Sequence, residues 1–209
     1  MTRGKFITLE GGEGTGKSTQ IARLAAFLEP CVGQVTITRE PGGSPGAEAI
    51  RALLVNGPAE RWSAQTETLL MYAARRDHIE RLIEPALSRG AWVVCDRFAD
   101  STRAYQGAAG GADPALIRAL EDHILGPLVP DLTLILDLPV SEGLSRARAR
   151  GEGEGRFESK GVAFHEALCQ AYLDIGAREP ERCRIVDARG SADDVASRIA
   201  GVVSERFSL

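Results

Sequence analysis

The segment Gly11–Ser18, GGEGTGKS, constrains this chain more than any other part of its sequence. It matches the spacing G-x-x-x-x-G-K-[ST] at every fixed position, follows the apolar run Lys5–Leu9, and opens a helical pattern that continues to about Leu28. Glycines let successive backbone N–H groups face a phosphate at the positive end of the helix dipole. The segment therefore predicts a nucleoside triphosphate site, in which Lys17 reaches the β- and γ-phosphates.

The predicted contacts of this site extend one residue beyond the motif. Ser18 is expected to ligate Mg²⁺, as the hydroxyl residue of such loops does. The nucleotide-contacting set consists of Gly11, Gly12, Glu13, Gly14, Thr15, Gly16, Lys17, Ser18 and Thr19.

Length and composition fit one soluble domain spanning residues 1–209. The chain has 209 residues, of which 44% are hydrophobic and 26% charged, enough for a sizeable core. Its net charge of -4 disfavours a nucleic acid held by broad phosphate contacts. No secretory signal and no run of ~20 apolar residues is present, so we expect a cytoplasmic protein without membrane contact. The four scattered cysteines, at 31, 95, 169 and 183, are expected to be buried thiols.

Five apolar runs of strand length alternate with helical segments. The expected strands are Lys5–Leu9, Gln34–Thr38, Ala91–Cys95, Leu132–Leu138 and Cys183–Val186. Between the second and third runs, apolar residues recur at helical spacing from Ile79 to Leu87. This alternation predicts an α/β fold with a five-stranded parallel sheet layered by helices. The segment Arg146–Ser159 has no apolar period of its own and is expected to be a solvated loop or a functional lid.

A second group of charged and polar residues follows the next two predicted strands. TREPGG follows one strand, and CDRFADSTRAYQG closes another. Ligands of α/β sheets gather at the carboxyl ends of the strands, so Arg39, Asp96 and Arg97 are expected near the phosphate loop. Each arginine alone could be a solvated surface charge, but two phosphate-binding clusters suit an enzyme that holds two phosphate-bearing substrates.

Other nucleotide-binding classes fit less well. A regulatory GTPase would need Asn-Lys-x-Asp, and the only asparagine is Asn56. A transport ATPase would carry a Leu-Ser-Gly-Gly signature, which is missing. These absences and the small size favour a small-molecule kinase over a nucleotide-dependent switch.

The combination of these motifs resembles the bacterial thymidylate kinase family. The resemblance runs through the phosphate loop, REPGG, AARRDH, DRF..ST.AYQG, PDLTLILD and the arginine-rich segment. It implies a three-layer P-loop kinase fold with a short lid at about residues 146–159, and transfer of phosphate from ATP, with Mg²⁺, to dTMP to give dTDP. It also implies a homodimer. A different acceptor monophosphate such as dUMP remains an alternative.

The resemblance also implies roles for individual residues. Arg97 and Arg39 would hold the dTMP phosphate, with Arg51 as a further candidate, while Asp96 would support the Mg²⁺ site through water. Glu13 would face the 3′-hydroxyl side of the acceptor sugar rather than the triphosphate. Tyr105 would lie near C2′ of that sugar. The acceptor-contacting set consists of Arg39, Glu40, Pro41, Arg51, Met71, Arg75, Arg97, Ser101, Thr102, Tyr105 and Gln106.

Position 71 departs from the family pattern. A phenylalanine commonly stacks on thymine four residues before the base-binding arginine, which here is Arg75, whereas this chain has Met71. Its polarisable sulfur could pack against a base, or the residue could simply be core.

The transition-state charge also needs partners beyond Lys17. The phosphate loop carries no arginine at Gly14 or Thr15, so the resemblance favours arginines on a closing lid, and Arg148, Arg150 and Arg156 are the candidates. The catalytic set is then Lys17, Arg97, Arg148, Arg150, Arg156 and Glu13. The segment Asp187–Ser191 is expected near adenine.

Overall fold

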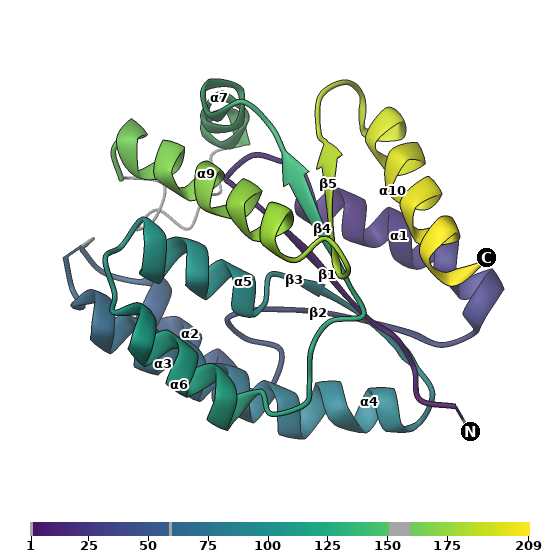
Figure 1. The fold of residues 1–209 in the computed structure, drawn as a ribbon, viewed down its shortest axis with the longest axis horizontal. Coiled ribbons are helices and arrows are strands. Elements are labelled where there is room, and N and C mark those ends of the chain that lie inside the picture. The colour runs from purple at the N-terminus through teal and green to yellow at the C-terminus, as the bar shows by residue number, and fades with distance from the viewer. Residues whose placement is uncertain (1, 59, 151–159) are drawn as a thin grey trace.

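A five-stranded parallel sheet forms the centre of the protein. The computed structural model describes residues 2–58, 60–150 and 160–209. Its strands are β1 (Phe6–Gly11), β2 (Val35–Arg39), β3 (Trp92–Asp96), β4 (Leu132–Asp137) and β5 (Cys183–Asp187). They run in the order β2-β3-β1-β4-β5, so β1 is central and the phosphate loop leaves the middle of the sheet (Figure 1). The predicted α/β class and the predicted strands are confirmed.

Alternate side chains of β1 enter two different cores. Ile7 and Leu9 are fully buried against α1 (Lys17–Val32) and α10 (Ala192–Phe207), which cover one face of the sheet. Phe6 points to the other face and packs edge-on against Phe98, with ring centroids 4.9 Å apart. Burial on both faces explains why the inner strands β1, β3 and β4 are apolar nearly throughout, whereas the edge strands β2 and β5 are partly exposed.

The opposite face is covered by a longer series of helices. α3 (Ala64–His78), the π-helical η1 (Ile79–Ile83) and α4 (Glu84–Ser88) follow one another without a break and form the predicted long helix. Ile79, Ile83 and Leu87 are fully buried, as their spacing predicts. The same layer contains α5 (Ala99–Thr102), the π-helical η2 (Arg103–Ala108) and α9 (Val162–Arg178), while α2 (Pro45–Val55) and α6 (Pro114–Ile124) pack on α3 (Figure 1).

The loop prediction for Arg146–Ser159 is wrong at its start. Helix α7 spans Val140–Arg150, so Arg146 and Arg148 lie on a helix. Val140, Leu144 and Ala147 recur at helical spacing and form the apolar side of this helix. The predicted segment begins at Arg146 and therefore excludes Val140 and Leu144. The rest of the predicted lid, including Arg156, lies outside the described residues.

Two cysteines also differ from expectation. Cys31 is exposed and Cys169 is only partly buried, whereas Cys95 and Cys183 are buried. Cys31 lies near the end of α1, which continues through Pro30 to Val32, and there the helix side chains are mostly exposed.

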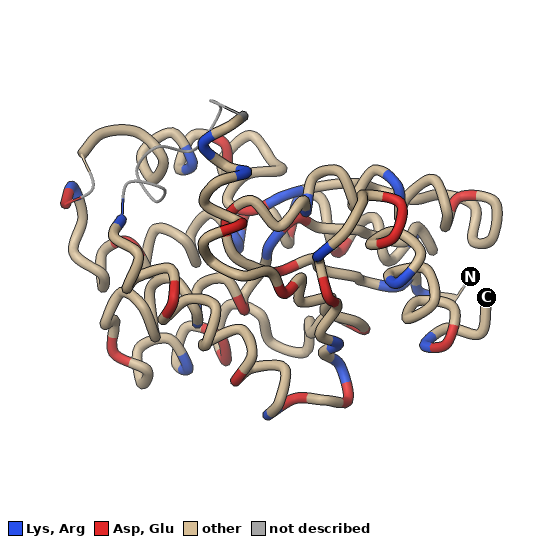
Figure 2. The backbone as a smooth tube through the Cα atoms, turned by 90° about the horizontal axis from the view of Figure 1, so that it is seen from above, with Lys and Arg blue, Asp and Glu red and all other residues tan. Residues whose placement is uncertain are grey.

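The surface carries both signs of charge. In the view of Figure 2, basic and acidic residues alternate along the chain and do not gather into one basic stripe. Within the ranges that the model describes, none of the helices has the length and apolar character needed to cross a lipid bilayer.

Candidate active site

The phosphate loop occupies the turn between β1 and α1. Gly14 and Gly16 have φ values of 69° and 88°, which favour glycine because a Cβ would be strained there. Lys17 folds back over the loop, and its Nζ donates to the carbonyl oxygens of Gly11 (3.1 Å) and Gly12 (2.9 Å). Burial, followed by the positive charge of Arg97, lowers the pKa of Lys17 to about 8 despite nearby carboxylates.

The loop lies against helix α7 with no room for side chains between them. A Cβ placed on Gly14 would lie 1.9 Å from the carbonyl oxygen of Gly143, and one placed on Gly143 would lie 2.4 Å from that of Glu13. Such distances are possible only between glycines. The helix that carries Arg148 and Arg150 is therefore in direct backbone contact with the phosphate loop. Arg148 is exposed.

Ser18 and Asp96 approach each other across the sheet edge. Ser18 Oγ donates to Asp96 Oδ2 at 3.3 Å. The other carboxylate oxygen, Oδ1, is buried and meets no hydrogen-bond donor within the described residues. A hydroxyl and a carboxylate are oxygen ligands of the kind Mg²⁺ prefers, and the orphaned Oδ1 has an unmet need for a cation or water. These residues fit the predicted metal role, although the described chain has no cluster of three His, Cys, Asp or Glu side chains that could hold a metal alone.

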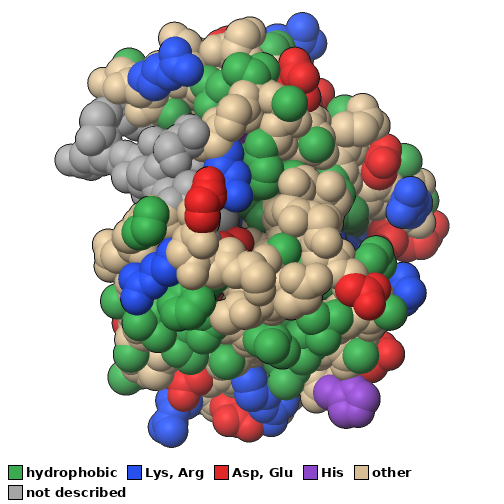
Figure 3. Space-filling model, turned by 90° about the vertical axis from the view of Figure 1, so that its left-hand side faces the viewer, with side chains coloured by type: hydrophobic (Ala, Val, Ile, Leu, Met, Phe, Trp, Pro, Cys, Tyr) green, Lys and Arg blue, Asp and Glu red, His purple; other side chains and the backbone are tan. Residues whose placement is uncertain are grey.

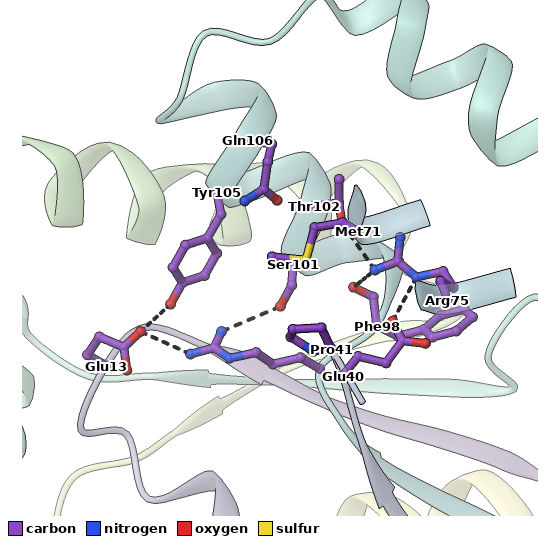
Figure 4. A pocket seen from close by; sticks show the side chains of 11 residues that line it. Glu13, Glu40, Pro41, Met71, Arg75, Phe98, Ser101, Thr102, Tyr105 and Gln106 are labelled. Atoms are coloured by element: carbon purple, nitrogen blue, oxygen red, sulfur yellow. Dashed lines mark hydrogen bonds and ion pairs between the residues drawn. The ribbon is translucent and has the colours of Figure 1, made fainter. Parts of the chain in front are cut away.

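A cavity opens beside the phosphate loop (Figure 4). Its wall combines residues from the phosphate loop after β1, the segment after β2, α3 and the segment after β3. The lining residues are Glu13, Glu40, Pro41, Met71, Arg75, Arg97, Phe98, Ser101, Thr102, Tyr105 and Gln106. All but Phe98 belong to the residues predicted from the sequence.

Arg97 joins this cavity to the phosphate loop. Its Nη1 donates to the Gly11 carbonyl oxygen (3.0 Å) and to Tyr172 Oη (3.2 Å), and its Nη2 donates to Glu13 Oε1 (3.2 Å). Its guanidinium carbon lies 4.8 Å from the centroid of the Tyr105 ring. The backbone of Arg97 has a φ of 67°, rare for a side chain of this size and typical of functional sites.

Glu13 is a charged wall residue of the cavity. Burial alone would raise its pKa, but the positive charges of Arg97 and Lys17 outweigh burial and lower the pKa to about 2. The Tyr105 hydroxyl also stabilises the carboxylate. Glu13 is therefore ionised at neutral pH, with its charge balanced by two cations beside the phosphate loop.

Arg75 forms the opposite end of the cavity. It is 3% exposed and donates from Nε to Glu40 Oε2 (2.7 Å) and from Nη2 to the Phe98 carbonyl oxygen (3.0 Å) and Thr102 Oγ1 (3.1 Å). Its Nη1 is buried and finds no acceptor within the described part of the chain. A buried guanidinium with spare donor capacity suits a ligand that brings an acceptor.

Arg39 and Arg51 lie outside the cavity lining. Arg39 pairs with Glu48 at 3.0 Å and is half exposed, while Arg51 Nη1 donates to the Pro41 carbonyl oxygen at 2.6 Å. Burial, followed by the positive charge of Arg39, lowers the pKa of Arg51. An anion bound near these two cations would relieve their mutual repulsion.

Three residues of the site escaped sequence reasoning. Phe98 follows Asp-Arg at the end of β3, a position that could have drawn attention to it. Glu10 is fully buried and accepts from Phe98 N (2.7 Å), Ser101 Oγ (2.6 Å) and Tyr172 Oη (3.1 Å). The only sequence feature that pointed to Glu10 was a carboxylate at the end of an apolar strand. Tyr172, on α9, had none.

Comparisons with known proteins agree with this geometry. The thymidylate kinase family model matches residues 9–199. A thymidylate kinase of Caulobacter vibrioides is 65% identical over 209 residues, covering 100% of both chains. One of Bradyrhizobium diazoefficiens is 53% identical, covering 98% of this chain and 91% of its own length.

A solved structure shares the fold as well as the sequence. The crystal structure of thymidylate kinase from Ehrlichia chaffeensis superimposes with a TM-score of 0.78 at 31% identity, over 96% of this chain and 99% of that one. The chain belongs to the thymidylate kinase family.

Proposed function

We propose that the cavity beside the phosphate loop binds dTMP, and that the loop binds the ATP whose γ-phosphoryl group is transferred to it. The family to which the chain belongs phosphorylates dTMP to dTDP. The observation that carries the proposal is the position of Arg97, whose guanidinium bonds the Gly11 carbonyl in the loop and also lines the cavity. One cation then serves both the acceptor phosphate and the site of transfer.

The acceptor would lie along the cavity from Arg75 to Glu13. Arg75 would donate to the base, and Met71 and Phe98 would form its apolar walls beside Thr102 and Gln106. Tyr105 and Glu13 would surround the sugar, with Glu13 accepting from the 3′-hydroxyl directly or through water. Arg97 would hold the phosphate, with Arg39 and Arg51 approaching from the sheet edge.

ATP would occupy the phosphate loop in the usual manner of this motif. Backbone N–H groups and Lys17 would hold the phosphates, while Ser18, followed by Thr19, lies at the start of α1. Lys17 would leave its carbonyl partners for the phosphates. Mg²⁺, held by Ser18 and, through water, by Asp96, would neutralise charge on the transferring group. The acceptor oxygen attacks in line, so no protein nucleophile is required.

The arginine-rich segment would act as the lid. Arg148 and Arg150 belong to a helix whose backbone touches the phosphate loop, and Arg156 follows them in sequence. Their charges would engage the transition state, and closure would exclude the water that otherwise accepts the phosphoryl group.

A homodimer is the second part of the proposal. Figure 3 presents the face at the left of Figure 1, near α2, α3 and α6, where hydrophobic side chains gather between charged ones. Leu53 on α2 and Leu69 on α3 are 40% and 50% exposed. Apolar side chains on neighbouring helices suit a symmetric contact between two copies.

The cytoplasmic location remains a prediction.

One assay separates the proposed enzyme from a nucleotide switch. ADP release is measured with ATP and Mg²⁺, with and without dTMP, and then with dUMP and other monophosphates. We expect release to depend on dTMP and dTDP to accumulate in equal amount. Slow ADP release that ignores every acceptor would refute the proposal.

A further inference from the structure

The amide of Gln106 is held by a buried carboxylate on another helix. Gln106, on η2, is 2% exposed and lines the cavity, where Figure 4 shows its amide group directed between Tyr105 and Met71. Its Nε2 donates to Glu67 Oε1 on α3 at 2.7 Å, and Glu67 is 7% exposed. Glu67 itself does not line the cavity.

This contact determines which end of the amide can meet a ligand. A carboxylate only accepts hydrogen bonds, so it attracts the NH₂ group of Gln106 and repels its carbonyl oxygen. In the described part of the chain no donor bonds the Gln106 Oε1. Rotating the amide by 180° would place two oxygens against each other in a buried site, which costs both the lost bond and the repulsion. Glu67 therefore leaves the side-chain carbonyl oxygen of Gln106 available to accept a hydrogen bond from a ligand.

We propose that Glu67 is a positioning residue that sets the base specificity of the cavity by keeping the Gln106 carbonyl oxygen toward the base. The inference rests on the proposed function of the cavity as the acceptor-nucleotide site. An acceptor at Gln106 and a donor at Arg75 match a base that presents a ring N–H beside a carbonyl, as thymine and uracil do. Cytosine presents an unprotonated ring nitrogen beside an amino group, so both contacts would be mismatched.

The test compares dUMP with dCMP, because these nucleotides differ only in that hydrogen-bonding edge. In the parent enzyme, kcat/KM should favour dUMP by at least about 100-fold, since a mismatched buried polar group is poorly tolerated. Glu67→Gln keeps the size of the side chain but can donate as well as accept, which frees the Gln106 amide to turn. The dUMP/dCMP ratio should fall at least about 10-fold, mostly through a gain with dCMP. The KM for ATP should not move.

A swapped pair supplies the rescue. In the double variant Glu67→Gln with Gln106→Glu, residue 106 can offer only an acceptor again, and the ratio should return toward the parent value. Glu80→Gln is the matched control, because it makes the same change in an exposed pair with Arg76 and should leave the ratio alone. Thermal melting confirms that each variant is folded.

The outcomes separate the inference from the function on which it rests. A parent that releases no dTMP-dependent ADP overturns the proposed function. A parent active on dTMP and dUMP, combined with an unchanged dUMP/dCMP ratio in Glu67→Gln, overturns only the role of Glu67. A swapped pair whose dUMP/dCMP ratio stays as low as in the single variant also overturns the role of Glu67. A merely structural Glu67 would lower activity with both nucleotides alike and leave their ratio unchanged.

Discussion

The Tyr105 hydroxyl donates a 2.6 Å hydrogen bond to Oε1 of Glu13, and this contact joins the wall of the cavity to the phosphate loop. The same oxygen accepts from Arg97 Nη2. An acidic residue in a loop made for polyanions is thereby turned toward the acceptor side and balanced by a cation. The charge that looks misplaced in the sequence lines the cavity that we propose holds the second substrate.

Removing the ring of Tyr105 should relax the preference for deoxynucleotides. The residue is 7% exposed in the cavity wall, so a 2′-hydroxyl would overpack against the ring at roughly 1–3 kcal/mol and be buried without a partner at roughly another 1–3 kcal/mol. We expect the parent to prefer dUMP to UMP by about 10²–10⁴ in kcat/KM. Tyr105→Ala should lose most of this ratio, whereas Tyr105→Phe keeps the ring and should retain it. Equal ratios in the parent and in Tyr105→Ala would show that another residue excludes the hydroxyl.

Arg97→Ala should damage the use of dTMP far more than the binding of ATP. It removes charge-assisted hydrogen bonds to the acceptor phosphate, each worth about 1.5–3 kcal/mol, so kcat/KM for dTMP should fall at least about 10-fold. Steady-state kinetics with dTMP and the Kd of ATP, measured by fluorescence titration, give the two readouts. Arg39→Ala is the comparison, because Arg39 is half exposed and outside the cavity lining, and its effect should be smaller. An Arg97→Ala enzyme with the parent's kinetics for dTMP would exclude Arg97 from the acceptor site.

Met71→Phe tests a position with two contacts at once. Met71 lines the cavity and also packs against the cluster around Tyr172. If the contact of residue 71 with the bound base matters more, a flat phenylalanine ring should bind dTMP as well as methionine or better, by up to about 1 kcal/mol. If the packing of residue 71 against the core matters more, the larger ring should overpack and lower the unfolding free energy by about 1–3 kcal/mol. The dissociation constant of dTMP and the melting temperature, each measured for the parent and the variant, distinguish these two cases. A lower Tm with unchanged dTMP affinity would assign Met71 to the core.

Glu10 should make the protein less stable as pH rises toward neutrality. Burial, followed by the negative charge of Asp100, raises its pKa from 4.5 to about 7, against hydrogen bonds from Ser101 and Phe98. The folded state therefore binds the proton more tightly than the unfolded state. This contribution is complete below pH 4.5 and is lost as pH rises to about 7, a change of roughly 3 kcal/mol.

Glu10→Gln cannot ionise and should abolish that dependence. Denaturant unfolding of both proteins between pH 4.5 and 8 measures it as the difference between their unfolding free energies. The difference should move in favour of the variant as pH increases. A constant difference across this range would mean that Glu10 does not titrate there.

Local patterns predicted much of the fold and many of the site residues. The inner strands were predicted because burial on both faces makes them apolar nearly throughout, and the partly exposed edge strands were predicted from short runs of apolar and β-branched residues. The phosphate loop was predicted because its backbone requires glycine at fixed spacing. The helical start of the arginine-rich segment was missed because its stripe begins at Val140, before the charged run.

The supporting contacts could not be read in the same way. Glu67 and Gln106 are 39 residues apart, and Glu10 and Tyr172 are 162 apart. Such pairs arise from the packing of helices against the sheet, and neither partner carries a local signal of the other. Sequence reasoning therefore predicted the residues that line the cavity better than the residues that orient them.

In the proposed mechanism, the Gly14–Gly143 contact would set the local concentration of the lid arginines Arg148 and Arg150 near the phosphate loop. Helix α7 rises about 1.5 Å per residue, so Arg148 and Arg150 have their Cα atoms within roughly 10 Å of this contact along the helix axis. A cation tethered so close to bound phosphates would act at an effective concentration in the millimolar range or above, without needing affinity of its own. If the lid assignment holds, the absence of side chains at these two glycines would determine how often an arginine reaches the transferred phosphoryl group.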